Sequence, residues 1–380
     1  MTFKAGLKSL LLSCTLVPMA CAAGATELRY ATGFPPGTTG AKNAEMTAQK
    51  LGEVTGGAMT MQSFAQSLLS FGEMSAGVRD GVADAGFVLF PYTPAEFRNS
   101  AMAADLTMMF ATMNTGDRGG LAWTGALSEY IIFNCPACQE EMKAQNQVYV
   151  STSATEYTLM CDTPVEEPGD LQGLKIRAPG ANWSRWASNF GAVPVQLSTA
   201  ETYEGMSQGI IDCTISGMTE ITDLGLTELI KRVLPNFPGG GFGGSAMHNI
   251  NRDTWASLSE DERRTYVETV SKGGAALSWE YRENNAKAAK VAADAGVKVA
   301  EATGPLMENT SAWIQKDIDN IATLYATDYG LKDTSESIET FRGIFEKWTG
   351  LVKNVNSREE LGDLIWQEIG AKIDYATYGL

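Results

Sequence analysis

The chain has 380 residues, with 29 Lys and Arg against 45 Asp and Glu and a formal net charge of −16. A surface this acidic repels nucleic acid and anionic lipid, which excludes both as partners. Because it also repels anions at long range, any anion site must be local, enclosed and built around a cation. The length exceeds the size at which one hydrophobic core stays efficient, which favours two domains.

Residues 1–25 are predicted to be a secretory signal peptide. Lys4 and Lys8 precede an apolar run at 10–19 that is too short to span a bilayer, and small residues follow it. Cys21 raises the alternative of a lipoprotein, but Pro18 stands where such a site usually carries leucine. We therefore expect export of the protein and simple cleavage near Ala22 or Ala25.

Strands and helices alternate in the first part of the mature chain. Strands are predicted at 28–32, 58–63 and 85–90, and helices at 41–54 and 71–82. The helix at 71–82 is amphipathic, because its apolar residues recur at spacings of three or four. Such alternation is typical of βαβ units and predicts an α/β fold with a largely parallel sheet.

Four cysteines remain after the leader, and export predicts that they are paired. Cys135 and Cys138 have the spacing of a redox-active dithiol, between an expected strand at 131–133 and an expected helix. A zinc site would need further ligands, and His248 is the only histidine. We favour a structural disulfide across a local turn, which leaves Cys161 to pair with Cys213.

A second strand and helix series runs from 148 to 213. Arg177 ends a short strand and is followed by Pro179 and Gly180, so the chain turns where the guanidinium projects. Its planar fork of donors matches a carboxylate in two parallel hydrogen bonds. A helix at 181–190 and a strand at 192–197 follow.

Helices are predicted to dominate after residue 238. The glycine-rich segment 238–245 is expected to be a flexible crossover or hinge. Ser259 and Glu262 have the spacing of a capping box that opens a helix. Later helices are predicted at 310–327, 335–352 and 359–376.

Several motifs together resemble the substrate-binding subunit of tripartite ATP-independent periplasmic (TRAP) transporters, of the DctP type. They are Gly-Leu-Lys-Ile-Arg-Ala-Pro at 173–179, Gly-Ala-Val-Pro-Val at 191–195, Glu-Thr-Tyr at 201–203 and Gly-Ile-Ile-Asp at 209–212. Segments 28–33, 72–84 and 250–258 extend the resemblance over nearly the whole mature chain.

This resemblance implies a two-domain periplasmic binding protein fold with the ligand cleft between the domains. Domain I would comprise 26–152 and about 242–285, domain II 153–241, and the helices of 286–380 would brace both. The implied protein is a periplasmic monomer that captures a small organic acid and delivers it to TRAP membrane subunits. It would not be an enzyme and would need no cofactor or metal.

The resemblance also implies ligand-binding residues. Arg177 matches the arginine that binds the carboxylate. Cleft positions of the family fall on Phe34, Phe90, Tyr92, Glu156, Tyr157, Thr214 and Ser216, and Trp183 is a candidate for an apolar wall. Tyr157 stands where relatives that bind acidic sugars often have a second arginine, which favours a ligand with a single carboxylate.

Other readings of the sequence remain open. Asp84, Glu201 and Asp212 are better explained as capping residues than as catalytic acids, and the lone His248 provides no catalytic triad. Two alternative functions are an exported thiol-disulfide oxidoreductase that uses Cys135 and Cys138, and a sensor subunit that binds the same ligand.

Overall fold

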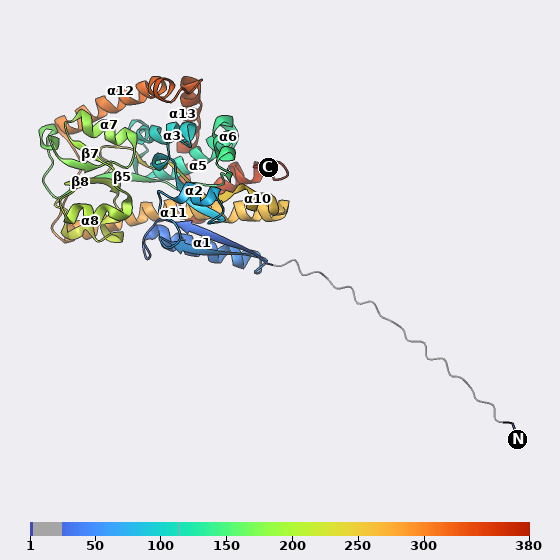
Figure 1. The fold of residues 1–380 in the computed structure, drawn as a ribbon. Helices are drawn as coiled ribbons and strands as arrows, with labels where there is room; N and C mark the ends of the chain where they lie inside the picture. Colours follow the sequence, from blue (N-terminus) through green and yellow to red (C-terminus); the bar gives the residue numbers. More distant parts are fainter. Residues whose placement is uncertain (3–24, 114) are drawn as a thin grey trace.

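The computed structural model describes residues 1–2, 25–113 and 115–380 (Figure 1). The predicted signal peptide therefore lies almost entirely outside the described residues. In the part of the chain that is described, no helix combines the length and the apolar character of a membrane span.

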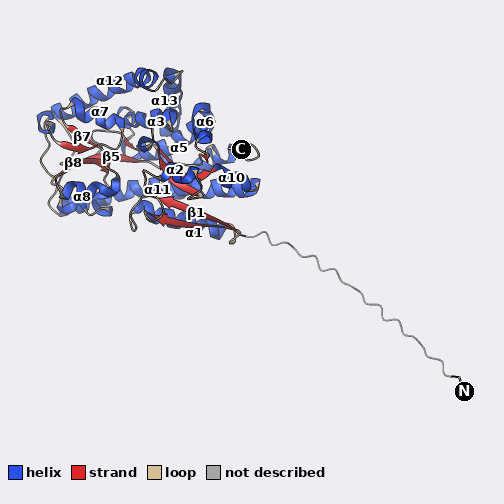
Figure 2. Cartoon of the chain, in the orientation of Figure 1, coloured by secondary structure: helices blue, strands red, loops and turns tan. Residues whose placement is uncertain are grey.

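The described chain folds around two β-sheets, one in each domain (Figure 2). The first sheet has the order β2-β1-β3-β11-β4, with β1 (Thr26–Thr32), β2 (Met59–Ala65), β3 (Ala85–Leu89), β4 (Gln147–Val148) and β11 (Ser245–Asn251). The second sheet has the order β12-β9-β5-β8-β6-β7, with β5 (Thr155–Cys161), β6 (Lys175–Arg177), β7 (Val193–Val195), β8 (Cys213–Gly217), β9 (Arg232–Leu234) and β12 (Lys298–Val299). A further strand, β10 (Gly241–Phe242), pairs with β5.

Both sheets are mixed, whereas the sequence predicted largely parallel ones. β1 is parallel to β2 and β3, and β6 is parallel to β7 and β8. β11 is antiparallel to β3 and β4, and β5 is antiparallel to β8 and β9. The antiparallel strands are those on which the chain enters the second sheet and returns to the first, so they carry the connections between the domains.

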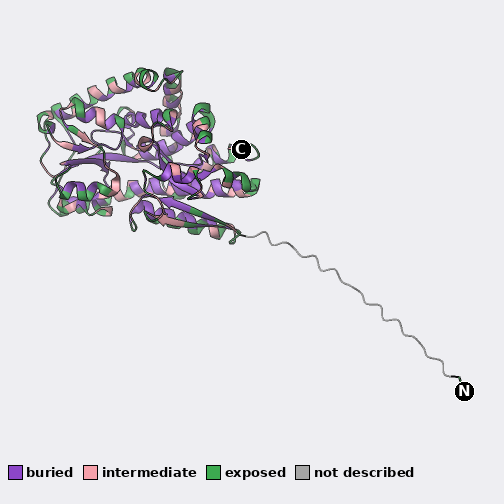
Figure 3. Cartoon of the chain, in the orientation of Figure 1, coloured by how far each residue is buried: buried purple, intermediate pink, exposed green. Residues whose placement is uncertain are grey.

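Helices cover the sheets and include a long C-terminal set. They are α1 (Thr39–Val54), α2 (Met74–Arg79), α3 (Arg98–Asp105), α4 (Met109–Thr112), α5 (Gly119–Glu129), α6 (Pro136–Ala144), α7 (Ala181–Asn189), α8 (Thr202–Ser207), α9 (Glu220–Asp223), α10 (Arg252–Ser257), α11 (Glu260–Asp294), α12 (Gly304–Asp328), α13 (Thr334–Leu351) and α14 (Arg358–Glu368). Figure 3 shows buried residues along the strands and the inner helix faces, with exposed residues on the outside.

Helix α11 runs across both domains, as Figure 1 shows. It contacts α1, α5 and α14 on one side and α9, β5 and β12 on the other. The predicted capping box opens it: Glu262 accepts a hydrogen bond from Ser259 N at 2.8 Å, and Glu262 N donates to Ser259 Oγ at 3.3 Å. A helix with 35 residues thus links the two domains along its length.

Several predicted elements differ in extent or kind. Helix α2 is shorter than predicted because residues before it form a turn closed by Ser70 and Glu73, and Gly81 follows it with a φ of 75°. The glycine-rich segment, expected to be flexible, is largely buried and includes β10, and a Cβ at Gly241 would meet the carbonyl oxygen of Thr155. Strand β12 joins the second sheet, although the sequence assigned its region to the bracing helices.

Strands β5 and β8 are joined covalently. Cys161 and Cys213 face each other in the register of the two strands, with their Cα atoms 4.1 Å apart, and form a disulfide. The neighbouring strand β6 pairs with β8 at Arg177 and Thr214. The disulfide therefore fixes the strand beside the one that carries Arg177.

Candidate functional site

A cavity lies between the two domains. The volume of this cavity that the centre of a water-sized sphere can occupy is about 110 Å³, which suits a small ligand. Its walls come from the ends of strands in both sheets and from helices α3, α7, α9, α11 and α12. The residues that bear on the argument below are Phe34, Phe71, Leu89, Tyr92, Asp105, Tyr157, Arg177, Trp183, Thr199, Glu220, Asp223, Phe242, Tyr281, Tyr325 and Tyr329.

Arg177 is completely buried at the end of β6 and is held by hydrogen bonds on every nitrogen. Its Nε donates to Leu197 O at 3.1 Å, and Nη1 donates to Ile215 O at 3.1 Å and to Ser216 Oγ at 3.3 Å. Its Nη2 donates to Thr199 Oγ1 at 3.2 Å and to Tyr92 OH at 3.4 Å. The strand end and its neighbours thus fix the guanidinium in one orientation, with Nη2 directed to the side where the first domain closes the cavity.

Electrostatics keep this guanidinium charged. Burial lowers the pKa of Arg177, but the neighbouring Tyr92, Glu220 and Tyr157 outweigh burial and raise it above its usual value. The wall therefore presents a fixed positive charge with little access to water. Such a group is suited to a carboxylate, which Arg binds with paired, charge-assisted hydrogen bonds.

Glu220 is the first residue of α9 and lies next to this arginine. Its carboxylate accepts a hydrogen bond from Ser216 Oγ, the same hydroxyl that accepts from Arg177 Nη1. Burial raises the pKa of Glu220 to about 7, although the charge of Arg177 acts in the opposite direction. Near neutral pH this carboxyl is therefore divided between its neutral and its ionised form.

Aromatic side chains form much of the remaining wall. In the first domain the ring of Phe34 meets Phe71 edge to face at 4.9 Å between centroids. In the second domain Tyr157 packs against Trp183 at 4.9 Å, and Trp183 Nε1 donates to Gly239 O at 3.1 Å. These contacts give the cavity rigid, flat surfaces.

The structure places five of the sequence-predicted site residues in the cavity wall, namely Phe34, Tyr92, Tyr157, Arg177 and Trp183. Ser216 lies behind the wall, where it contacts both Arg177 and Glu220. Thr214 is buried in β8 and does not line the cavity.

Glu156 and Phe90 lie outside the wall, contrary to the prediction. Successive side chains of a strand point to opposite faces, so Glu156 is turned away from the cavity while Tyr157 faces it. Glu156 instead accepts a hydrogen bond from Gly120 N at 2.9 Å at the start of α5, and burial raises its pKa. Phe90 is fully buried and packs against Phe97, with 5.3 Å between ring centroids.

Sequence reasoning missed Glu220, Asp223 and the tyrosines of the late helices, namely Tyr281, Tyr325 and Tyr329. One signal for Glu220 was present, because it follows closely after the buried strand that ends at Gly217. Ligands of open α/β sheets bind beyond the carboxyl ends of strands, where that residue stands.

Two helices receive their N-terminal hydrogen bonds from the opposite domain. Asp223 of the second domain accepts from Thr39 N at 2.8 Å and Thr39 Oγ1 at 3.2 Å, at the start of α1. Asp105 of the first domain accepts from Asn182 N at 2.9 Å, in the first turn of α7, and from Arg185 Nη1 at 2.8 Å. Burial raises the pKa of both carboxyl groups, which their donors partly oppose.

The carboxylates interpreted as caps make backbone contacts. Asp84 accepts from Arg29 N at 2.8 Å, and Asp212 accepts from Lys175 N at 2.7 Å, so each holds the neighbouring parallel strand in its own domain. Glu201 forms a capping box with Ser198. His248 is buried and stacks on Tyr30 with 4.4 Å between ring centroids.

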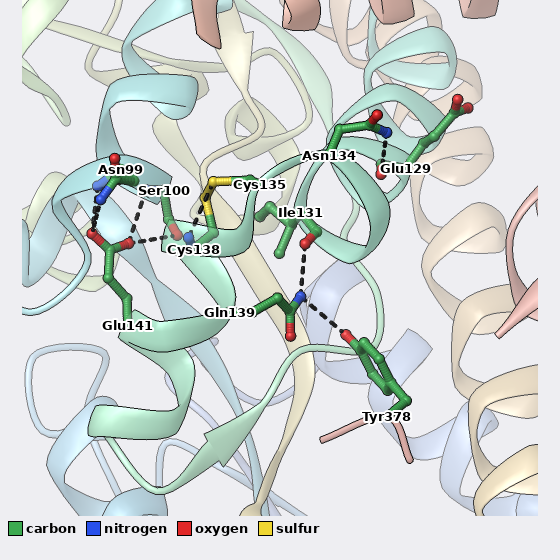
Figure 4. Close-up of a disulfide and its surroundings, with 10 residues drawn as sticks. All are labelled: Asn99, Ser100, Glu129, Ile131, Asn134, Cys135, Cys138, Gln139, Glu141 and Tyr378. Carbon is green, nitrogen blue, oxygen red and sulfur yellow. Dashed lines mark hydrogen bonds between the residues drawn. A yellow bond between two sulfur atoms is a disulfide. The ribbon is translucent and has the colours of Figure 1, made fainter. Parts of the chain in front are cut away.

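Cys135 and Cys138 form a disulfide at the start of α6, shown in Figure 4. The preceding residues, predicted as a strand, form a π-helical turn at Tyr130–Asn134. Both cysteines are buried, and Cys138 N donates to Cys135 Sγ at 3.1 Å. Burial shields the bond from an attacking thiolate, which disfavours the oxidoreductase alternative.

The surroundings of this disulfide serve to anchor helices. Glu141 on α6 accepts from Asn99 N at 2.6 Å and Ser100 N at 3.1 Å, so it caps the start of α3 (Figure 4). Gln139 donates to Ile131 O at 2.6 Å. The disulfide thus stabilises the start of α6, the helix that contacts both α3 and the π-helical turn.

Two mixed α/β domains, a cavity between them and a buried arginine in its wall define a binding protein for small solutes. The chain belongs to the bacterial extracellular solute-binding protein family 7 (DctP), whose model matches residues 30–324. Members of this family act as solute-binding receptors outside the cytoplasm. A comparison with curated proteins found no match.

Solved structures of TRAP solute-binding proteins share the fold. One from Desulfovibrio salexigens, an open complex, is 21% identical with a TM-score of 0.67, covering 87% of this chain and 98% of that chain. One from a marine metagenome, in complex with 3-hydroxybenzoate, is 19% identical with a TM-score of 0.70, covering 86% and 99%. DctP6 of Bordetella pertussis, which binds pyroglutamic acid, is 18% identical with a TM-score of 0.69, covering 84% and 100%.

Proposed function

We propose that this protein is the substrate-binding subunit of a TRAP transporter and that it binds a small organic acid through Arg177. The observation that carries the proposal is a buried, fully oriented guanidinium in the wall of a cavity between the two domains. Structures of the same fold are described with 3-hydroxybenzoate and with pyroglutamic acid, both of which carry a carboxyl group.

Binding would replace the weakest contact of Arg177. The hydrogen bond from Nη2 to Tyr92 OH is 3.4 Å long, the longest that the guanidinium makes within the described residues. A carboxylate at this position would accept from Nη2 in a shorter, charge-assisted bond. The ligand leaves the site chemically unchanged, because its role is to be carried and not converted.

We further propose that the two domains close on the ligand as nearly rigid bodies. Domain I comprises 26–152 and about 242–285, domain II comprises 153–241, and the later helices brace both. Supporting contacts span the cavity, among them Arg177 with Tyr92 and Asp223 with Thr39. Closure of this kind would let TRAP membrane subunits distinguish the loaded from the empty monomer in the periplasm.

A thermal-shift screen of mono- and dicarboxylates, sugar acids and aromatic acids tests the proposal, followed by calorimetry on the compounds that stabilise the protein. A ligand at a hundredfold excess over its Kd should stabilise the fold by about 2.7 kcal/mol. Small-angle scattering should show a smaller radius of gyration at saturation. Stabilisation only by compounds without a carboxylate would contradict the proposal.

A further inference from the structure

The cavity wall contains more acidic than basic side chains. Among the described residues that line it, Arg177 is the only Arg or Lys, whereas Asp105, Glu220 and Asp223 are carboxylic acids. A ligand that carried only a carboxylate would add another anion to this cavity. The balance of charges therefore depends on which of the three acids already has a partner.

Two of these acids are matched by the protein. Asp105 pairs with Arg185 at 2.8 Å and accepts from Asn182 N. Asp223 accepts two hydrogen bonds from Thr39 at the positive N-terminal end of α1. Neither acid needs the ligand to complete its hydrogen bonds.

Glu220 is different. Its Oε2 accepts from Ser216 Oγ, but within the described residues no group donates to Oε1. Among the described residues, no carboxylate oxygen of Glu220 lies within 4 Å of a guanidinium nitrogen of Arg177. The hydroxyl of Ser216 lies between the two side chains and bonds to both. One oxygen of a largely buried carboxyl therefore remains available to a group in the cavity.

We propose that Glu220 makes the site selective for zwitterionic acids, with the ligand's carboxylate on Arg177 and a cationic nitrogen on Glu220. This inference rests on the proposed function. A protonated nitrogen would donate to the available oxygen and offset its charge, which a plain carboxylic acid cannot do. The tyrosine and tryptophan rings nearby, among them Tyr157, Trp183 and Tyr281, also favour a cation over their faces.

The arrangement also limits the spacing of the two charges in the ligand. Arg177 and Glu220 share the single hydroxyl of Ser216, so the groups they bind lie close together. Amino acids and cyclic imino acids, in which one carbon separates the carboxylate from the nitrogen, meet this condition. Burial raises the pKa of Glu220 to about 7, so a cationic partner would readily shift this carboxyl to its ionised form.

Calorimetry at pH 8 with pairs of compounds that differ in the nitrogen tests the inference. The pairs are proline and cyclopentanecarboxylate, pipecolate and cyclohexanecarboxylate, and phenylalanine and 3-phenylpropanoate. The expected result for the wild-type protein is at least tenfold tighter binding of the zwitterion in one or more pairs. Glu220→Gln, which keeps the shape of the side chain, should abolish this preference by weakening the zwitterion and leaving the plain acid unchanged or tighter.

Glu228→Gln is the matched control, because Glu228 is exposed in the same domain and does not line the cavity. It should keep the preference of the wild-type protein. Tighter binding of the plain acids by the wild-type protein, an unchanged preference in Glu220→Gln, or binding of neither series would overturn the inference. Binding of plain carboxylates alone would leave the proposed function standing, whereas full carboxylate affinity in Arg177→Ala would overturn the proposed function itself.

Discussion

The first domain lines the cavity with Phe34, Phe71 and Leu89, whereas the second contributes Arg177, Thr199 and Glu220. Arg177 stands at the end of β6, where the carbonyls of Leu197 and Ile215 and the hydroxyl of Thr199 orient it. The first domain offers mainly apolar surface, with Tyr92 as its link to the arginine. In the proposed mode of binding, the second domain would recognise the ligand's carboxylate, and the first domain would mainly exclude water.

The largest expected effect concerns the stability of the second domain. The Cys161–Cys213 disulfide spans 52 residues, for which the chain-entropy model gives about 4 kcal/mol of unfolding free energy. Replacing both cysteines by serine should lower the free energy of unfolding in urea by up to this amount. Ligand affinity of the folded protein should persist, because neither cysteine lines the cavity.

The Cys135–Cys138 disulfide is the internal control, since it spans only 3 residues and the same model gives roughly 1.5 kcal/mol. Equal losses from the two double variants would show that the long disulfide does not constrain the second domain as its loop length predicts.

Removal of the arginine should have the next largest effect. Arg177→Ala should weaken ligand binding by about 3 kcal/mol, or more than a hundredfold, because hydrogen bonds to charged groups are the strongest that the site offers. Arg177→Lys should restore only part of this affinity, since lysine lacks the planar fork. Calorimetry provides the measurement.

Arg118→Ala is a suitable control for that variant. Arg118 donates to Val352 O and Val355 O, both at 2.7 Å, and is absent from the cavity wall. Its loss should reduce stability but not affinity. A similar loss of affinity in both variants would mean that charge recognition does not reside at Arg177.

Glu220 should also make the stability of the empty protein depend on pH. Its pKa rises from 4.5 to about 7 on folding, so between these values the folded state binds more protons than the unfolded state. Stability should therefore fall as pH rises through this window, by at most about 1.4 kcal/mol per pH unit from this single group. The contribution of Glu220 is the difference in melting temperature between wild type and Glu220→Gln, measured from pH 4.5 to 8. Parallel curves for the two proteins would contradict this contribution.

Tyr92→Phe should have the smallest effect. The variant keeps the apolar surface of the first domain and removes only the hydroxyl that accepts from Arg177. The bound carboxylate would replace this hydroxyl as the partner of Nη2, and one neutral hydroxyl is worth about 1 kcal/mol, so affinity should stay unchanged or rise by up to about fivefold. A loss of affinity as large as that of Arg177→Ala would show that the first domain also recognises the ligand's carboxylate.

Local features of the site were predictable from the sequence. The short strand that ends at Arg177, the turn at Pro179 and the capping box at Ser259 each depend on neighbouring residues. Glu156 was misplaced because the resemblance located a strand segment without its facing, and a shift of one residue exchanges wall for core. Phe90 follows the end of β3, and its neighbour Leu89 lines the wall instead.

The contributions of the late helices were not predictable in the same way. Tyr281 lies on α11, which packs against elements of both domains, so no single apolar stripe marks its cavity side. Tyr325 on α12 and strand β12 reach their positions only through contacts between distant segments. Such contacts follow from tertiary packing, which the local periodicity of the sequence does not predict.

The exchange of helix caps between the domains bears on the energetics of release. Opening the cleft would remove Asp223 from the start of α1 and Asp105 from the start of α7. A lost N-cap costs roughly 1 kcal/mol, so two of them bias the population toward the closed form by about thirtyfold even without a ligand. Whatever opens the protein to unload it must overcome this bias in addition to the affinity for the solute.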